Sequence, residues 1–539
     1  MTSYSIDNVD INQWLDDYEA DKQGRFHALL FDPPYALIEN SKRFSSPTAK
    51  APDDTYAGGA YTRQAKGFMS STWDGFLSLA HYQRWVTEWA RKLHRVMYPG
   101  AVGAAFGGSR TWHRLAVGLE DAGLEIVDTI IWAYGSGMPK SLNIGRAIDK
   151  RAGYTAAKRK QLLADGREST RRATSVAHGD YGDKSETYEA KYFTPEGQRW
   201  SGHGTLLKPA YEPIIIFRVP RGKSSFIDLA QQYGTGALNI DATRIPTGDK
   251  WTQSTTPVTS RNNFIGKHEN REDYGVRESH EAGRFPANVV LTHSPDCEPD
   301  DCAPGCPVRE INEQSGNRPA GGNVTGQEPS APTVGIFGDY DRQPYEGYSD
   351  SGGAARFFYS GKAATWERSL PNYLSPSDEL GARGQAELLA NLAKLDYKPK
   401  FGSIDIFDPG QLPTEFKRLM QPARCTHPTV KPIELTTYLA KLLLPPDGQE
   451  RRLLIPFSGV GSEMIGGALT GWEFIQGIEL TPDYIPQAYD RLKWWSQFNS
   501  YESAQLAYNQ KKDTARESVA LEKAREKAGV RQVPLMPEE

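Results

Sequence analysis

An acidic residue, two prolines and a tyrosine follow a short apolar run near the start of the chain. Residues 28–31 predict a buried parallel strand, and Asp32, Pro33, Pro34 and Tyr35 come directly after it. Because two successive prolines can extend neither a helix nor a sheet ladder, the chain must turn there. Open α/β sheets bind ligands at the C-terminal ends of their strands, so we expect these side chains at a binding crevice.

The residue types of this turn suit methylation of an exocyclic amino group on a nucleobase. Such an amine is a weak nucleophile because its lone pair is delocalised into the ring. The Asp32 carboxylate and a neighbouring backbone carbonyl can accept hydrogen bonds from the NH2 group and stabilise the positive charge that develops during attack. Tyr35 can stack on a base that has left the duplex, while the prolines hold the acceptors in place. A plain turn that ends a strand is the alternative interpretation.

A glycine loop between two apolar runs near the other end of the chain predicts a nucleotide site. Residues 453–462 predict a strand and then a loop, residues 463–469 a helix, and residues 474–479 a second strand that ends in an acid. Glycines at such a turn let the backbone approach a ligand, and the acid commonly holds a ribose diol. A nucleotide site combined with an amine-activating turn indicates S-adenosylmethionine as the cofactor.

Three segments in a fixed order resemble the DNA amino-methyltransferases of the β motif order. They are Asp-Pro-Pro-Tyr at residues 32–35, His-Pro-Thr-Val-Lys-Pro at residues 427–432 and Pro-Phe-Ser-Gly-Val-Gly at residues 456–461. Further stretches resemble the bacteriophage-type members of the family, at residues 66–69, 73–74, 106–108, 135–141, 207–213, 234–241 and 356–359. The resemblance extends over most of residues 27–495, and its specificity lies in the ordered combination.

The resemblance implies a role for each matching residue. The catalytic turn corresponds to Asp32, Pro33, Pro34 and Tyr35. The residues implied to bind the cofactor are Phe31, Thr429, Lys431, Pro456, Phe457, Ser458, Gly459, Gly461 and Glu479. In the family, the phenylalanine packs on the cofactor, the strand-ending acid binds its ribose, and the threonine and lysine lie near its methionine end.

One position departs from the family pattern. Many members carry an acid where this chain has Ile455, so any contact made by that acid is lost. Glu463 lies just after the glycine loop and could replace it. An acid in the first turn of a helix also has a structural explanation, because it stabilises the helix dipole.

The family implies methyl transfer from S-adenosylmethionine to adenine N6 in double-stranded DNA whose target base is flipped out. Adenine is favoured over cytosine N4 because the turn opens with Asp rather than Ser, and an N4-cytosine enzyme is the first alternative. A non-catalytic DNA-binding protein on a decayed methyltransferase fold is the second. Enzymes acting on RNA or protein glutamine mostly place the cofactor loop first. The family also allows a homodimer and a restriction partner, as in a restriction-modification system.

Length and composition agree with a multidomain enzyme inside the cell. The 539 residues predict two or three domains, and a hydrophobic fraction of 38% excludes wholesale disorder. We find no apolar run of the ~18 residues that a membrane span needs, no signal peptide, and only four cysteines. These features predict the cytoplasm of a bacterial or phage-infected cell, without membrane contact. With a net charge of -4, DNA binding would need a local basic surface.

After the strand at residues 28–31, residues 101–106 and 129–132 predict further strands, and residues 81–93 and 110–121 predict helices. This alternation over residues 27–140 favours an α/β fold, and residues 214–217 predict one more strand of its sheet. We expect a Rossmann-like methyltransferase sheet, mostly parallel with helices on both faces, and an inserted loop-rich target-recognition module. The expected units are a polar leader (1–26), a catalytic half (27–225), the inserted module (226–425), a cofactor-binding half (426–500) and a charged helical tail (501–539). No role is predicted for residues 371–424.

Two clusters outside these motifs predict binding. Basic side chains outnumber acidic ones over residues 140–172, which is typical of phosphate contacts and also of solvated faces. Within the inserted module, His293, Cys297, Cys302 and Cys306 could complete a tetrahedral structural zinc site. Cys425 could take the place of the histidine, and a set of reduced thiols is the alternative interpretation.

Overall fold

The computed structural model describes most of the chain, and every structural statement below concerns the described residues. These are residues 2–36, 76, 78–135, 137, 141–154, 192–247, 252–253, 277–278, 282–294, 297, 301–319, 350–362, 365–368, 425, 427 and 429–510.

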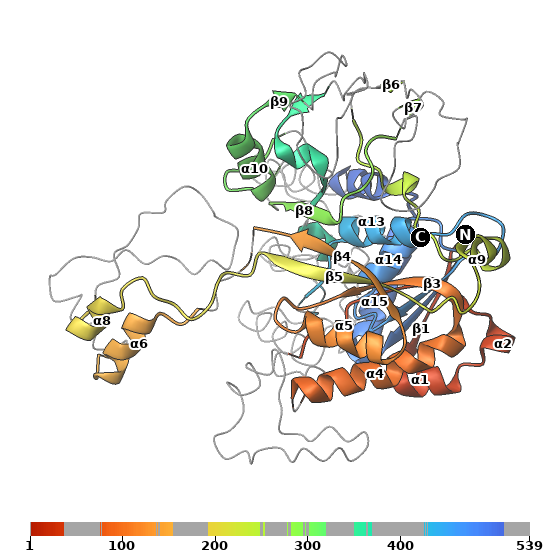
Figure 1. The fold of residues 1–539 in the computed structure, drawn as a ribbon, viewed down its shortest axis with the longest axis horizontal. Helices are drawn as coiled ribbons and strands as arrows, with labels where there is room; N and C mark the ends of the chain where they lie inside the picture. Colours follow the sequence, from red (N-terminus) through yellow and green to blue (C-terminus); the bar gives the residue numbers. More distant parts are fainter. Residues whose placement is uncertain are drawn as a thin grey trace, which may run out of the picture.

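Nine strands form one twisted sheet in the order β1-β13-β12-β2-β3-β5-β4-β8-β11 (Figure 1). Their bounds are β1 (Ser3–Asn8), β2 (Phe26–Phe31), β3 (Met97–Phe106), β4 (Glu125–Ala133), β5 (Tyr211–Arg218), β8 (Val289–His293), β11 (Tyr359–Lys362), β12 (Arg452–Pro456) and β13 (Phe474–Glu479). All neighbouring strands are parallel except that β5 runs antiparallel to both β3 and β4. The prediction of a mostly parallel sheet of the α/β, Rossmann-like type is confirmed.

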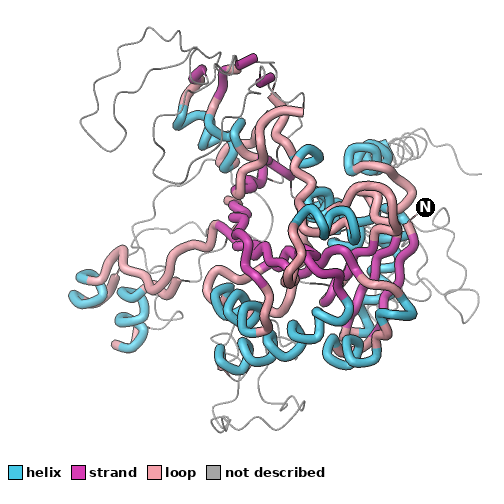
Figure 2. The backbone as a smooth tube through the Cα atoms, turned by 45° about the vertical axis from the view of Figure 1, so that its right-hand side comes forward, coloured by secondary structure: helices cyan, strands magenta, loops and turns pink. Residues whose placement is uncertain are grey.

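Helices cover both faces of the sheet (Figure 2). One face packs against α1 (Ile11–Asp17), α4 (Leu79–Val96) and α5 (Trp112–Asp121), and the other against α13 (Ile433–Leu443), α14 (Ser462–Ala468) and α15 (Ile485–Trp495). Each face of the sheet carries its own hydrophobic core, and alternate residues of β2 pack into the two cores. Leu30 packs on one side, and Leu29 and Phe31 pack on the other. Because each such buried side chain contributes about 1.5–3 kcal/mol, the run at residues 28–31 fixes β2 in the centre of the sheet.

The first 26 residues differ from the expected polar leader. They supply the edge strand β1, which pairs with β13 in parallel over six residues, together with α1 and the short helix α2 (Ala20–Gln23). In β1 only Ile6 is buried. An edge strand with a single inward-facing apolar residue carries almost no hydrophobic pattern, which is why the sequence predicted no strand there.

The inserted module also contributes to the main sheet, because β8 and β11 extend it beyond β4. The other elements of the module are short. They are α9 (Phe226–Tyr233), η2 (Asp241–Thr243), β6 (Thr252–Gln253), β7 (Arg277–Glu278), α10 (Pro307–Ser315), β9 (Arg318–Pro319), β10 (Ser351–Gly352), η3 (Ala354–Phe357) and η4 (Thr365–Arg368). Residues 371–424, for which the sequence predicts no role, lie outside the described residues.

A helical arm stands away from the sheet, at the left of Figure 1. It consists of α6 (Ile144–Arg151) and α8 (Pro195–Arg199). The fully buried Asp149 joins the two, because its carboxylate accepts hydrogen bonds from the Phe193 N–H (3.0 Å) and from the N–H and hydroxyl of Thr194. These buried hydrogen bonds therefore hold α6 and the segment that leads into α8 together within the arm.

The cofactor-binding half ends with the turn η6 (Pro482–Tyr484), helix α15 and a helical segment at residues 501–510. The rest of the predicted charged tail, residues 511–539, lies outside the described residues. Among the described helices, none has the length and apolar character needed to cross a membrane.

Candidate active site

The two sequence motifs that lie farthest apart in the chain meet at one edge of the sheet. Strand β12 pairs directly with β2, with Leu453 opposite Ala28 and Leu454 opposite Leu29. Since the strands are parallel, the acidic turn after β2 and the glycine loop after β12 leave the sheet side by side. Both loops therefore lie at the same edge of the sheet, as a single site for cofactor and substrate requires, and we call the region between them the crevice.

Lys431 joins the acidic turn to the segment that precedes α13. Its ammonium lies 2.6 Å from the Asp32 carboxylate, 3.0 Å from the Tyr35 hydroxyl and 3.4 Å from the Glu212 carboxylate. Only 5% of Lys431 is exposed. Burial alone lowers the pKa of Lys431, but the charges of Asp32 and Glu212 outweigh it, so the pKa lies above its ordinary value and the group stays charged.

The second oxygen of Asp32 faces this crevice without a partner. Oδ2 accepts from Lys431, whereas the buried Oδ1 has no hydrogen-bond partner among the described residues. The Thr111 hydroxyl donates to the Tyr35 carbonyl (2.6 Å) and so fixes the end of the proline turn. A buried carboxylate oxygen left unpaired is costly, and a ligand N–H group would satisfy it.

The acidic turn and the glycine loop are each accompanied by a residue with a strained backbone conformation. Only two non-glycine residues in the described part of the chain have a positive φ: Ala36 (51°), just after the acidic turn, and Phe457 (59°), just after β12. Such conformations cost about 1–3 kcal/mol each and tend to occur at functional sites. Their positions support a functional interpretation of both loops.

Glu212 belongs to this cluster although the sequence assigned it no role. The Tyr35 hydroxyl donates to its carboxylate (2.8 Å), and burial followed by the charges of Asp32 and Glu212 raises the pKa of Tyr35. Glu212 lies near the start of β5, where an acid would normally be far from the C-terminal ends of parallel strands. Because β5 is antiparallel, its start lies at the active edge. The sequence does not show that β5 runs antiparallel, and for this reason it did not identify Glu212 as a site residue.

The glycine loop is shaped by Glu479, the acid that ends β13. Its carboxylate accepts hydrogen bonds from the Gly459 N–H (2.8 Å) and the Thr481 N–H (2.7 Å), and burial raises its pKa. Gly459 and Gly461 have φ values of 51° and 80°, which L side chains rarely adopt. Each carboxylate oxygen of Glu479 keeps acceptor capacity for a ligand diol.

The Phe457 ring packs within an aromatic group on the α4 face of the sheet. Its centroid lies 5.5 Å from that of Trp85, 5.7 Å from Trp89 and 6.1 Å from Phe31. Phe31 is fully buried at the end of β2. Pro456 and Ser458 on either side of Phe457 are buried as well. The predicted cofactor residues of this loop are thus brought together around the end of β12.

Glu463 is a buried carboxyl in the first turn of α14. Burial, and after it the charge of Asp32, raise the pKa of Glu463 to about 7. Its Oε1 has no hydrogen-bond partner among the described residues. Ile455, at the position of the missing acid, is instead fully buried in the core. The cluster around Lys431 therefore contains three carboxyl groups, those of Asp32, Glu212 and Glu463, and one ammonium.

An acid from a distant segment accepts a hydrogen bond from the N-terminus of α13, the helix that follows Lys431. Glu367 in η4 accepts a hydrogen bond from the Ile433 N–H (3.0 Å) at the N-terminus of α13, and Tyr501 donates to its other oxygen (2.6 Å). This is the position where a carboxylate stabilises a helix. Thr429, predicted near the methionine end of the cofactor, is exposed, and its N–H donates to His427 Nδ1 (3.3 Å).

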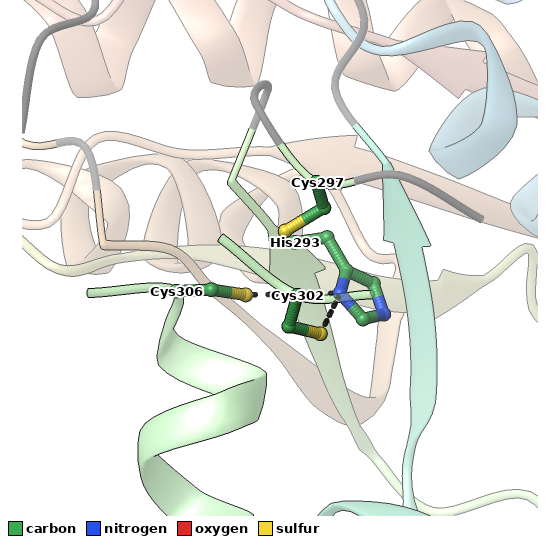
Figure 3. Close-up of side chains that lie close together, drawn as sticks. All are labelled: His293, Cys297, Cys302 and Cys306. Atoms are coloured by element: carbon green, nitrogen blue, oxygen red, sulfur yellow. Dashed lines mark hydrogen bonds between the residues drawn. The ribbon is translucent and has the colours of Figure 1, made fainter. Parts of the chain in front are cut away.

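The four predicted metal ligands gather at and after the end of β8, which is separated from β2 in the sheet by β3, β5 and β4. The ligand atoms of His293, Cys297, Cys302 and Cys306 all lie within 4.8 Å of one another (Figure 3). Cys425 does not join them, because it is buried against Val460 beside the glycine loop. Its predicted role as a substitute ligand finds no support.

Of the basic segment at residues 140–172, the structure describes α6 and its flanks. Arg146, Lys150 and Arg151 line a surface pocket of the arm together with Leu142, Asn143 and Ala147. The remaining basic residues, 158–172, lie outside the described residues.

Comparison with known proteins agrees with this geometry. A family model described as DNA methylase, of the N6/N4 methyltransferase type, matches residues 26–490. No curated protein has significant sequence similarity to the chain.

Solved structures of two DNA-modifying enzymes align over most of the chain. The cytosine-N4-specific PvuII DNA methyltransferase aligns over 91% of this chain and 86% of its own, with 9% identity and a TM-score of 0.33. The M1.HpyAVI–SAM complex aligns over 91% of this chain and 99% of its own, with 9% identity and a TM-score of 0.29. The family model, which covers both loops of the crevice, makes the assignment: the chain belongs to the N6/N4 DNA methyltransferase family.

Proposed function

We propose that this protein transfers a methyl group from S-adenosylmethionine to the N6 amino group of adenine in DNA. The observation that carries the proposal is the buried Oδ1 of Asp32 directly after β2, which has no hydrogen-bond partner within the described part of the chain and lies beside the glycine loop of β12. In this reaction the target amine donates a hydrogen bond to that oxygen, which stabilises positive charge on the nitrogen as it attacks.

The glycine loop and Glu479 supply the features of a nucleoside site. The backbone of Gly459 and Gly461 leaves space for close approach, and Glu479 retains acceptor capacity for a ribose diol. S-adenosylmethionine, when bound there, supplies an activated methyl group on a positively charged sulfur.

The charge balance of the crevice favours a positively charged ligand. Asp32 and Glu212 lie against a single ammonium, that of Lys431. Glu463 adds a third carboxyl group, which interacts with Asp32, Lys431 and the Arg491 guanidinium, and burial followed by the charge of Asp32 raises its pKa to about 7. A sulfonium group, or an amine that gains positive charge, would compensate the excess negative charge.

The chain's own residues then account for the remaining steps. Tyr35 is held by Glu212 and Thr111 so that its ring can pack against a flipped base. With S-adenosylmethionine bound, the amine would attack the methyl group in line as the bond from methyl to sulfur breaks, and the methylated amine would then release its proton to solvent. No residue becomes covalently modified, so catalysis consists of positioning and charge stabilisation.

Adenine is the proposed target because the catalytic turn opens with Asp32, as in adenine-specific members, where cytosine-specific members tend to carry Ser. Cytosine N4 is the second candidate, since its amino group presents the same chemistry and the PvuII enzyme, one of the aligned structures, is cytosine-N4-specific.

Nucleoside mass spectrometry tests the proposal. DNA from methylation-deficient cells that express the chain should contain N6-methyladenine, and DNA from cells that express Asp32→Ala should contain none. Asp32→Ala should nevertheless bind labelled S-adenosylmethionine within a few fold of the parent, because the glycine loop and Glu479 make the proposed contacts to the nucleoside part of the cofactor. N4-methylcytosine instead would identify the second candidate, and equal loss of cofactor binding and turnover would contradict the role of Asp32.

A further inference from the structure

We propose that His293, Cys297, Cys302 and Cys306 form a structural zinc site that fastens the outer part of the sheet to α10. The site is distinct from the proposed methyl-transfer crevice, and the inference stands independently of that activity.

The first argument is distance. His293 Nδ1 lies 3.3 Å from the Cys302 sulfur and 3.7 Å from the Cys306 sulfur. A tetrahedral zinc ion with Zn–S bonds of about 2.3 Å and Zn–N bonds of about 2.1 Å separates its ligand atoms by roughly 3.5–3.8 Å. The four ligand atoms all lie within 4.8 Å of one another, so only small shifts would bring all of them within bonding distance of one ion. Figure 3 shows the imidazole and the thiols turned toward one another.

The second argument is the set of backbone contacts around the sulfurs. The Ser294 N–H donates to the Cys306 sulfur (3.4 Å), and the Ala303 N–H donates to the Cys297 sulfur (3.3 Å). Such outer hydrogen bonds orient ligands and stabilise the thiolate form that binds a metal. Three thiolates and one imidazole are a ligand set that favours zinc, and four protein ligands leave no open position.

The third argument is the small size of the local core. The buried residues of this cluster are Leu291, Cys297, Cys306, Val308 and Ala355. Two of these five are cysteines, so little apolar area remains to hold β8, the following loop and α10 together. Units with so small a core generally need disulfides or a metal, and the described cysteines form no disulfide.

The placement of the ligands explains what the ion would fasten. His293 ends β8, and Cys306 directly precedes α10. In turn, α10 packs on η3 through the Asn312 side chain, which accepts a hydrogen bond from the Ala355 N–H (3.0 Å), and η3 leads into β11. One ion would thus tie both strands that extend the sheet beyond β4 to their covering helix.

Metal analysis of the purified full chain is the test. Protein produced in zinc-supplemented medium should contain about one zinc per chain by plasma mass spectrometry, and Cys302→Ser should lose most of it. Cys302 is only partly buried, so serine there costs little packing. Cys425→Ser removes a thiol outside the cluster and should retain the zinc.

A second readout needs no variant. Cobalt added to chelator-treated parent protein should give the intense visible bands of a tetrahedral cobalt–thiolate site. Hydrogen exchange over residues 289–315 should rise when zinc is removed, while exchange in β2 and β12 stays unchanged. Folded parent protein that binds less than about a tenth of an equivalent of zinc or cobalt would overturn the proposal. So would a disulfide between two of the three cysteines.

Discussion

One buried ammonium organises the crevice at the scale of residues. Lys431 contacts Asp32, Tyr35 and Glu212, which come from two separate strand ends. Removing a partner from such a buried group leaves an uncompensated charge, which typically costs 3–5 kcal/mol. Glu463 lies within electrostatic reach of Asp32 and Lys431 and is the group whose charge state changes near neutral pH.

Glu463 should make the stability of the ligand-free protein fall as pH rises. Its pKa is raised from 4.5 to about 7 in the folded state, so between these values the folded chain holds a proton that the unfolded chain has lost. The stabilisation is present below pH 4.5 and lost as pH rises through about 7. Glu463→Gln should therefore raise the melting temperature at about pH 8 relative to the parent and change it little at about pH 5.

Thermal unfolding of both proteins across this pH range checks the prediction. The difference between the two melting temperatures is the quantity of interest, because other buried acids such as Glu367, with a pKa raised to about 8, affect both proteins equally. Melting curves that shift in parallel at every pH would show that Glu463 does not titrate as described.

At the scale of elements, the sequence predicted most of what lies at the centre of the sheet. The apolar runs of β2, β3, β4 and β5 and the helical patterns of α4 and α5 predicted those elements within a few residues. These elements are buried on one or both faces, so their patterns are strong. The motifs also located Asp32, Lys431 and the glycine loop, because their residue types are tied to specific chemistry.

The sequence could not show which strands pair with one another or in which direction each strand runs. Nothing in the run Ile214, Ile215, Ile216 and Phe217 shows that β5 is antiparallel, and this reversal is what brings Glu212 to the crevice. Edge strands such as β1 and β11 bury too few side chains to produce a period of two. Long-range pairing depends on the partner strand, which a local pattern does not contain.

The contact between α13 and α14 gives a prediction at this scale. A Cβ at Gly466 would lie 2.6–2.8 Å from backbone atoms of Thr436 and Thr437 in α13. Gly→Ala inside a helix normally stabilises by roughly 0.5–1 kcal/mol, but here the backbones would have to separate. Gly466→Ala should instead destabilise by about 1–3 kcal/mol, measured by urea unfolding.

Gly467→Ala is the matched control in the same helix. A Cβ there meets only the ends of the Ile475 and Leu453 side chains, at 2.8 and 2.9 Å, and these ends can move. Its cost should be clearly smaller. Equal stability of the parent and Gly466→Ala would show that the two helices are not in close backbone contact.

At the scale of the whole molecule, the arm is the part best placed to extend the protein's contact with DNA. A net charge of -4 means that phosphate contacts must come from a local surface. Arg146, Lys150 and Arg151 form such a surface on α6, and the acid within this helix, Asp149, is turned inward to α8. The basic face therefore has no carboxylate of its own helix beside it.

Reversing two charges on the arm should weaken DNA binding in a salt-dependent way. If Arg146 and Lys150 each contact a phosphate, the double variant Arg146→Glu and Lys150→Glu should lower the slope of log affinity against log salt by about 2. Fluorescence anisotropy with a duplex at several salt concentrations measures that slope.

The control carries the same change of charge at the opposite end of the molecule, near α2 (Figure 1). Lys22→Glu and Arg25→Glu together should leave the slope unchanged, because these side chains pair with Glu19 and Asp21 far from the arm. Identical slopes for the two double variants would exclude the arm as a phosphate-binding surface.

The pairing of β1 with β13 and of β2 with β12 has a consequence for protein synthesis. Strand β1 can pair with β13, and β2 with β12, only after more than four hundred further residues have left the ribosome, and Asp32 lies 399 residues before Lys431. A chain whose translation stops early would expose the unpaired edge of β2 and lack the lysine, the glycine loop and Glu479. Interrupted products should therefore be removed by proteolysis, and only finished molecules could mark the genome.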